Sequence, residues 1–173
     1  MNIIEFIKKT PKAELHLHIE GTLEPDHMFA LAKRNNIQIP FTNVDEVKSA
    51  YNFSNLESFL NIFYQGSKVL VKEQDFFDLT WAYVLKCKAD NVVHTEIFFD
   101  PQTHVDRGIN FDTVINGIYE ALQKANKEFG LTFKIIMCFL RHLDEEAGFE
   151  MLDQASAHKE KIVGVGLDSS EIG

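Results

Sequence analysis

The sequence predicts an α/β fold in which four parallel strands alternate with helices. Four short apolar runs, at residues 13–20, 92–100, 132–141 and 162–169, are separated by longer segments whose apolar residues recur with the helical period. Parallel neighbours need a crossover connection, and that connection is usually a helix. No repeat, linker or low-complexity segment interrupts this pattern, so we expect a single domain over residues 1–173.

Caps and apolar faces predict the helices between these runs. Pro25 is a favourable first helical residue, and it begins a helix that reaches Asn35. Ser54, with Glu57 three residues later, predicts a capping box at the start of the next helix. Apolar faces are formed by Leu56, Phe59, Leu60, Phe63 and Leu70, then by Phe76, Leu79, Tyr83 and Cys87, and further helices are expected over 111–129 and 144–158.

The connection between the first two strands, residues 21–91, is far longer than is usual between a strand and a helix. Among its phenylalanines are Phe41, Phe53, Phe59, Phe63, Phe76 and Phe77. Two interpretations are open. The segment either supplies apolar walls to a pocket or forms a small satellite core of its own.

The composition excludes several classes of partner and location. With 17 Lys and Arg against 26 Asp and Glu, the net charge is -9, which argues against nucleic acid because such partners require neutralised phosphates. Cys87 and Cys138 form neither a CxxC pair nor a Cys/His cluster, as suits a reducing cytosol. The first twelve residues lack a cleavable leader pattern, and no apolar run approaches the ~20 residues of a membrane span. We therefore expect a cytoplasmic protein with no membrane partner.

The first strand carries an unusual polar face. In KAELHLHIEGTLEP, residues 12–25, two glutamates and two histidines alternate with apolar residues. Successive side chains of a strand point to opposite faces, and both faces of a parallel sheet are covered, so polar groups there need partners. We expect Glu14, His16, His18 and Glu20 on one face, with Leu15, Leu17 and Ile19 beneath helices on the other.

Two imidazoles beside carboxylates are most simply satisfied by a cation, which makes His16 and His18 candidate metal ligands. Residues i and i+2 lie ~6.6 Å apart along a strand, a separation that two rings can close to meet one ion. The pair precedes Gly21 near the carboxyl end of the strand, where barrel and open α/β proteins bind ligands. An antiparallel sheet with one wet face would show the same alternation, and that alternative stays open.

Four motifs together resemble a known family. They are PKAELHLHIEGTLEP at 11–25, EIFFDPQTH at 96–104, Arg141-His142, and GVGLDSSEIG at 164–173. The sequence is similar to the adenosine and adenine deaminase family, zinc hydrolases built on a TIM barrel, and most similar to its adenine-specific branch. The resemblance implies that the four strands, with extra helices after the first strand, are the N-terminal half of a (β/α)8 barrel, since a barrel needs eight strands and ~250 residues.

The resemblance also implies a reaction, the hydrolytic deamination of adenine to hypoxanthine and ammonia in purine salvage. Zinc would be held by His16, His18 and two further residues. The catalytic Glu, His and Asp of the family belong to motifs expected beyond residue 173, so no catalytic residue is assigned within this chain. Glu20 and Glu171 are the candidate substrate-binding residues. Glu20 replaces the Asp usual in adenosine deaminases, and Asp168-Ser169-Ser170-Glu171 replaces Asp-Leu-Ala-Gly, which favours a free base.

Two alternatives remain. One is an adenosine or modified-nucleoside deaminase, and the other is an inactive half-barrel fragment. Because a half-barrel has open strand edges and two of the expected metal ligands, these 173 residues alone are expected to be inactive, to hold zinc poorly and to self-associate. Deaminases that act on nucleic acid are excluded, because their H-x-E and P-C-x-x-C signature is absent. The expected partner is a small-molecule purine.

Other polar residues carry weaker signals. His94, Glu96 and Asp100 share one face of the second strand, where a structural ion pair is the common role. Arg141 and His142 end the third strand, where loop residues are fair site candidates. His27, His104 and His158 fall in helix or loop contexts, and no role is expected for them.

Overall fold

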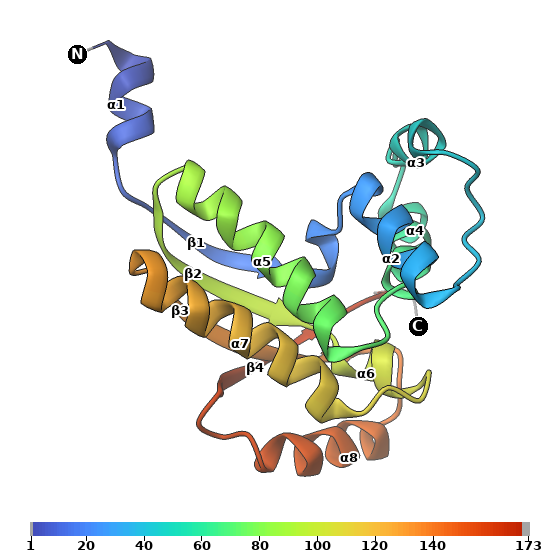
Figure 1. Cartoon of the computed structure of the whole chain (residues 1–173). Coiled ribbons are helices and arrows are strands. Elements are labelled where there is room, and N and C mark those ends of the chain that lie inside the picture. Colours follow the sequence, from blue (N-terminus) through green and yellow to red (C-terminus); the bar gives the residue numbers. More distant parts are fainter. Residues whose placement is uncertain (1, 171–173) are drawn as a thin grey trace.

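The computed structural model describes residues 2–170, and within that range it contains the predicted parallel sheet. Its strands are β1 (Lys12–His18), β2 (Val92–Phe99), β3 (Thr132–Leu140) and β4 (Ile162–Asp168), which lie side by side in chain order (Figure 1). All three neighbouring pairs are parallel. The α/β class and the four parallel strands are therefore confirmed.

Helices fill the connections. Helix α1 (Ile3–Lys9) precedes β1, and the long connection after β1 holds the 3-10 helix η1 (Ile19–Thr22), α2 (Pro25–Asn35), α3 (Val44–Ala50), α4 (Leu56–Ser67) and α5 (Glu73–Ala89). The later connections hold α6 (Pro101–Val105) and α7 (Phe111–Phe129), then α8 (Glu145–Ser156). Helices α2 and α7 have the predicted ends, whereas α1, α3 and α6 were not expected. No helix among residues 2–170 is both long and apolar enough to cross a membrane.

Three local boundaries differ from the prediction. The α4 cap is formed by Asn55, whose Oδ1 accepts a hydrogen bond from the Ser58 N–H at 2.9 Å, since Asn is as good an N-cap as the expected Ser54. Helix α4 ends at Ser67, so Leu70 lies outside it. Strand β1 ends at His18 because the chain turns into η1, and Glu20 is therefore not a strand residue.

The prediction that Glu14 shares a face with His16, His18 and Glu20 is wrong, because the pairing of β1 with β2 has an irregular register. Glu14 is aligned with Thr95 and Leu17 with Ile97, so three steps along β1 match two along β2. An extra residue of this kind moves the following side chains to the opposite face. Glu14 consequently lies on the helix side, where the Tyr83 hydroxyl donates to its Oε2 at 2.7 Å. Leu15, expected beneath the helices, is 55% exposed.

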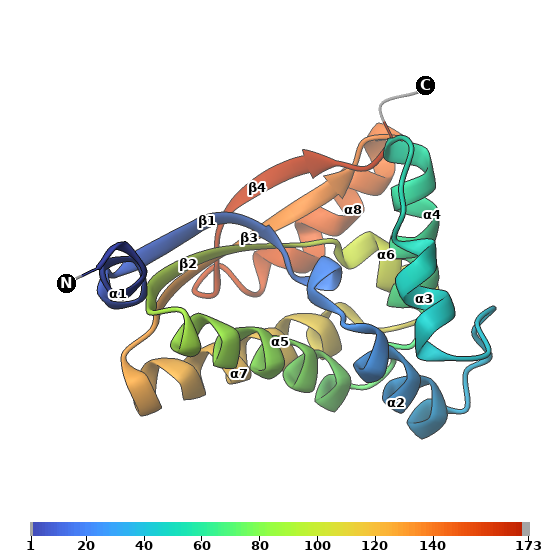
Figure 2. The same cartoon turned by 90° about the horizontal axis from the view of Figure 1, so that it is seen from above.

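The sheet is covered by helices on its outer face. Helices α5 and α7 lie along that face and α8 packs beside β3, whereas α4 lies at the carboxyl ends of the strands and α1 at the opposite end (Figures 1 and 2). The core fills the space between the sheet and the helices. Its fully buried members include Ile97, Phe99, Ile135 and Met137 from the strands and Leu79, Ile115, Ile118 and Leu122 from α5 and α7.

The edges of the described sheet are β1 and β4. On β4 the alternate residues Val163, Val165 and Leu167 are 56%, 57% and 59% exposed, respectively. Contiguous apolar surface of this kind is typical of a face that another element covers.

Close packing of α5 on α7 depends on Gly117, and Gly117→Ala should destabilise the protein. A Cβ at this position would lie 2.8 Å from Phe76 Cβ and 3.0 Å from Phe77 N, and closer still to the Glu73 carbonyl. We expect a loss of about 1–3 kcal/mol in the free energy of unfolding, measured by denaturant titration of the full-length protein. Gly148→Ala is the matched control in α8, because nothing lies within 4 Å of its added Cβ. It should raise stability by about 0.5–1 kcal/mol, and equal effects of both changes would contradict the packing explanation.

Candidate metal centre and binding pocket

A cavity of about 290 Å³ opens at the carboxyl ends of the strands. Helix α4 supplies an apolar wall, and the strand ends supply polar groups. The lining residues are Leu56, Phe59, Leu60, Phe63 and Tyr64 from α4, with His16, His18, Gly21, Asp100, Arg141, Leu167, Asp168 and Ser169. Its position is where ligands bind in parallel α/β proteins.

His16 and His18 lie on the same side of β1, against one aromatic ring. Their ring centroids are 5.5 Å apart, and both rings stack on Phe98 of β2, at 4.4 and 5.2 Å. The irregular register lies before His18, and it leaves these two histidines together while it separates Glu14 from them.

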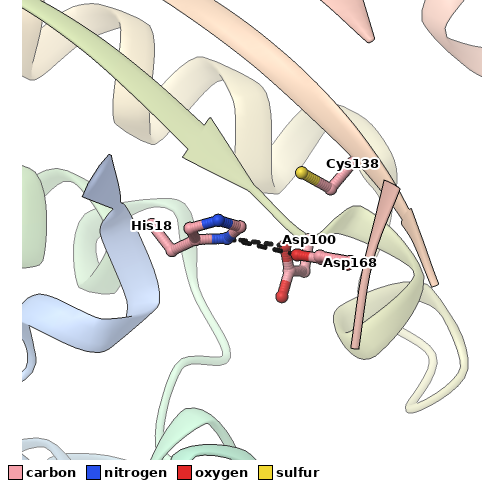
Figure 3. A group of neighbouring side chains, drawn as sticks. All are labelled: His18, Asp100, Cys138 and Asp168. Carbon is pink, nitrogen blue, oxygen red and sulfur yellow. Dashed lines mark ion pairs between the residues drawn. The ribbon is translucent and has the colours of Figure 1, made fainter. Parts of the chain in front are cut away.

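Two aspartates, at the carboxyl ends of β2 and β4, converge on His18. Its Nδ1 lies 3.1 Å from Asp168 Oδ2 and 3.6 Å from Asp100 Oδ1 (Figure 3). The candidate donor atoms of His18, Asp100, Asp168 and Cys138 all lie within 4.8 Å of one another. Sequence reasoning missed Asp168 as a site residue and gave Asp100 a structural role. Both directly end parallel strands that finish at one edge of the sheet, and that signal could have found them.

The pKa values of this group are shifted because carboxylates lie close to one another and to the His18 imidazole in a largely buried place. Burial alone would lower the pKa of His18, but the adjacent Asp100 and Asp168 carboxylates outweigh it and raise the pKa to about 10. Burial raises the pKa of Asp100 well above its usual value, and the charge of Glu20 adds to this shift. Burial also raises the pKa of the Cys138 thiol, which disfavours the thiolate form that a metal requires.

Open acceptor atoms at this site fit a metal ion. Among the described residues, Glu20 Oε2, Asp100 Oδ1 and Asp168 Oδ1 are buried and accept no hydrogen bond. Buried acceptors of this kind are costly unless a donor or a cation satisfies them. Imidazole and carboxylate donors are those that zinc takes in proteins. A divalent cation beside His18 therefore suits both the donor chemistry and the open acceptors.

Glu20, a predicted substrate-binding residue, lies behind the cavity wall rather than in its lining. Its side chain is fully buried. Its Oε1 accepts hydrogen bonds from the Asp100 N–H at 2.9 Å and from His104 Nε2 at 3.2 Å. Burial raises its pKa to about 7. Glu171, the other predicted substrate-binding residue, lies outside the described residues.

Helix α4 is held over the strand ends by a cluster of hydroxyl and imidazole groups. The Tyr64 hydroxyl lies 2.6 Å from Ser169 Oγ, and His142 Nδ1 lies 2.9 Å from the same oxygen. Ser169 has a φ of 77°, which is strained for a residue with a side chain. Arg141 donates from Nε to the Asp168 carbonyl at 3.1 Å. Arg141 and His142 thus both meet the end of β4.

The remaining histidines lie apart from this group. His94 Nε2 is 3.6 Å from Glu96 Oε1, in line with the structural pair expected for that strand. His158 Nε2 is 2.6 Å from Asp112 Oδ1 on the outer side of the sheet. His104 differs from its prediction, because it is fully buried and bonded to Glu20.

Comparison with known proteins places the chain in a family. Residues 11–173 match the family model described as adenosine deaminase. Adenine deaminases of Psychrobacter cryohalolentis and Wolinella succinogenes are 60% identical over 171 residues and 62% identical over 169 residues. These alignments cover 99% and 98% of this chain but 52% and 51% of the relatives. The chain therefore spans about half the length of the curated relatives it matches.

Solved structures give the same fold. The crystal structure of adenine deaminase from Arthrobacter aurescens superposes with a TM-score of 0.90 at 46% identity, over 94% of this chain and 50% of that chain. An amidohydrolase from Burkholderia ambifaria with bound Zn superposes with a TM-score of 0.84 at 24% identity, over 97% of this chain and 46% of that chain. At that identity the likeness shows the fold alone.

Fold and site together define an α/β barrel protein with a candidate metal centre, of which this chain contains four strands, and the expected half-barrel is confirmed. The chain belongs to the adenosine deaminase family.

The Tyr64 contact generates a prediction about α4. Tyr64→Phe removes the hydroxyl that meets Ser169 at 2.6 Å, and one hydrogen bond contributes about 0.5–1.5 kcal/mol. Amides of residues 56–67 should therefore exchange with solvent roughly 2–10-fold faster in hydrogen-exchange mass spectrometry of the full-length protein. Tyr119→Phe is the control, because the Tyr119 hydroxyl meets Gln123 within α7 at 2.6 Å. Unchanged exchange in Tyr64→Phe would show that this bond does not hold α4.

Proposed function

We propose that the full-length protein catalyses the hydrolytic deamination of adenine to hypoxanthine, with release of ammonia. The observation that carries the proposal is the 60–62% identity to two adenine deaminases over 98–99% of this chain. The histidine and carboxylate cluster at the strand ends supports it, because hydrolysis at a purine carbon needs an activated water molecule. The substrate is a small-molecule purine, and we expect the reaction to serve purine salvage in the cytoplasm.

We propose zinc as the cofactor, with His16 and His18 as the ligands that this chain contributes. The stacking of both rings on Phe98 supports this assignment, since it limits how far either imidazole can rotate. When bound, zinc lowers the pKa of a water molecule to near neutrality and so supplies hydroxide. Further ligands and the group that moves protons are expected in the part of the family barrel that this chain does not contain.

Asp168 would orient His18 rather than bind the ion directly. Its Oδ2 lies 3.1 Å from His18 Nδ1, so an Nδ1–H donated to Asp168 leaves Nε2 available as the ligand atom. Metal-binding histidines usually donate their second N–H to a carboxylate or a carbonyl in this way. Asp100 Oδ1, at 3.6 Å from the same nitrogen, supports the orientation from the adjacent strand.

The apolar wall of α4 would cover a flat base and exclude water. Phe59, Phe63 and Leu60 line the cavity opposite the polar strand ends. A dry wall strengthens electrostatic interactions inside a site. Adenine is favoured over adenosine by the Glu20 and 168–171 sequence differences. The burial of Glu20 behind the wall agrees with this, because that carboxylate does not line the cavity where a ribose would lie.

Substrate choice is tested by ammonia release from the full-length protein with adenine and with adenosine. We expect adenine to be turned over at least ten times faster, and removal of metal by dipicolinate to abolish the activity until Zn²⁺ is restored. Faster turnover of adenosine would favour the nucleoside alternative. Absence of turnover with either substrate at full zinc occupancy would contradict both the adenine and the nucleoside assignment.

The orienting role of Asp168 predicts a metal phenotype. Asp168→Ala should weaken Zn²⁺ binding by roughly 10–100-fold, the range for loss of a group that orients a ligand, as measured by competition with a chromophoric chelator. With Co²⁺ at saturation the visible spectrum should keep its shape, because no ligand atom is lost. Glu96→Ala, which also removes a carboxylate from the inner face, should leave affinity unchanged. A changed Co²⁺ spectrum would make Asp168 a ligand.

A further inference from the structure

A chain of hydrogen bonds runs from half-buried Arg107, just after α6, through His104 of α6 to Glu20 of η1. Arg107 Nη2 lies 2.8 Å from His104 Nδ1, and His104 Nε2 lies 3.2 Å from Glu20 Oε1. The side chains of His104 and Glu20 are both fully buried. Phe76 packs edge-on against the His104 ring, with centroids 4.8 Å apart. Three polar groups of unlike chemistry are thus held in sequence inside the protein.

The hydrogen bonds to Arg107 and Glu20 are compatible with only one tautomer of His104. A guanidinium has no acceptor, so the Arg107 contact requires a lone pair on Nδ1. The proton of a neutral imidazole then lies on Nε2 and is donated to Glu20. Burial and the nearby Arg107 charge lower the pKa of His104 to about 3, in agreement with a neutral ring.

Both ends of this hydrogen-bond chain contact parts of the site: Arg107 contacts the end of α4, and Glu20 contacts Asp100. Arg107 also donates to the carbonyls of Ser67, Lys68 and Leu70, at 3.2, 3.1 and 3.1 Å, where α4 ends. A cation at a helix C-terminus stabilises the open carbonyl groups there. At the other end, Glu20 Oε1 accepts from the Asp100 N–H at 2.9 Å. Asp100 in turn places Oδ1 at 3.6 Å from His18 Nδ1.

We propose that His104 is a positioning residue that fixes the Glu20 carboxylate through its Nε2–H, and so holds Asp100 in place beside the metal ligand His18. The proposal rests on the proposed function for the metal, although its geometry stands by itself. Neutral His104 has one N–H to donate, and Glu20 Oε1 accepts that bond together with a separate bond from the Asp100 N–H. Without the His104 bond, the buried carboxylate loses one of the two donors that it has among the described residues and is free to rotate away from Asp100.

Two substitutions of His104 test its two ring nitrogens separately, because each keeps one of the two hydrogen bonds and removes the other. His104→Gln places an amide N–H near the position of Nε2, so it can still donate to Glu20 but gives up the Arg107 contact. His104→Asn places its amide near Nδ1, so it can still meet Arg107 but cannot reach Glu20. Each loses one buried hydrogen bond, and both should lower the melting temperature by a similar amount. His158→Asn is the control. It breaks the contact between His158 Nε2 and Asp112 Oδ1, which are 2.6 Å apart and lie on the outer side of the sheet, away from the site.

The readouts are made on the full-length protein, with Zn²⁺ as the probe. His104→Asn should weaken Zn²⁺ binding by roughly 10-fold and lower kcat for adenine at zinc saturation by a similar factor, whereas His104→Gln should stay within about 3-fold of the unaltered protein. His158→Asn should change the melting temperature alone. Equal effects of the two His104 variants on zinc affinity, or no effect of His104→Asn, would overturn the proposal.

A measurement on the unaltered protein covers the case in which the His104 variants do not fold. Imidazole nitrogen shifts in ¹⁵N NMR should show His104 neutral, with the proton on Nε2, from pH 5 to pH 8. A proton on Nδ1, or a charged ring, would overturn the proposal. If the unaltered protein binds zinc but does not release ammonia from adenine, the proposed reaction fails, while the tautomer and the zinc comparison still decide the role of His104.

Discussion

The pairing of β1 with β2 determines which polar groups can meet in this protein. Between Glu14 and Leu17 the first strand carries one residue more than its neighbour, and the face of every side chain after that point is reversed. Regular alternation would have put Glu14 beside the two histidines. Instead Glu14 lies among the outer helices, and the imidazoles of His16 and His18 lie together against Phe98.

This separation produces two buried polar networks with different properties. On the helix side the Tyr83 hydroxyl gives its one proton to Glu14, so Thr95 must donate in turn to Tyr83, at 2.6 Å. That network stabilises the packing of α5 on the sheet, and the Tyr83 hydroxyl within it already has both a donor and an acceptor as partners. At the strand ends, by contrast, one buried carboxylate oxygen in each of Glu20, Asp100 and Asp168 accepts no hydrogen bond among the described residues. The open acceptors mark the second network as the one suited to a cation.

The long connection after β1 serves both the core and the cavity, so neither interpretation of its phenylalanines is sufficient alone. Phe59 and Phe63 line the cavity from α4, and Phe76 is fully buried against His104. Apolar residues of α2 and α3, such as Met28 and Val47, join the same core cluster as the sheet, so no separate satellite core forms among the described residues. Arg107 and Tyr64 both fix the C-terminal end of α4, because Arg107 binds the Ser67 and Leu70 carbonyls and Tyr64 meets Ser169.

The sequence by itself determined the α/β class, the four strands, the ends of α2 and α7 and the pairing of two histidines at a strand end. These features depend on local periodicity, caps and the two-residue repeat of a strand, all of which can be read from neighbouring residues. Only the tertiary structure decided that Glu14 leaves the polar face, that Asp100 and Asp168 reach His18, and that His104 binds Glu20. Those contacts join residues 82 or more positions apart, or depend on one extra residue in a register, and no local pattern encodes either.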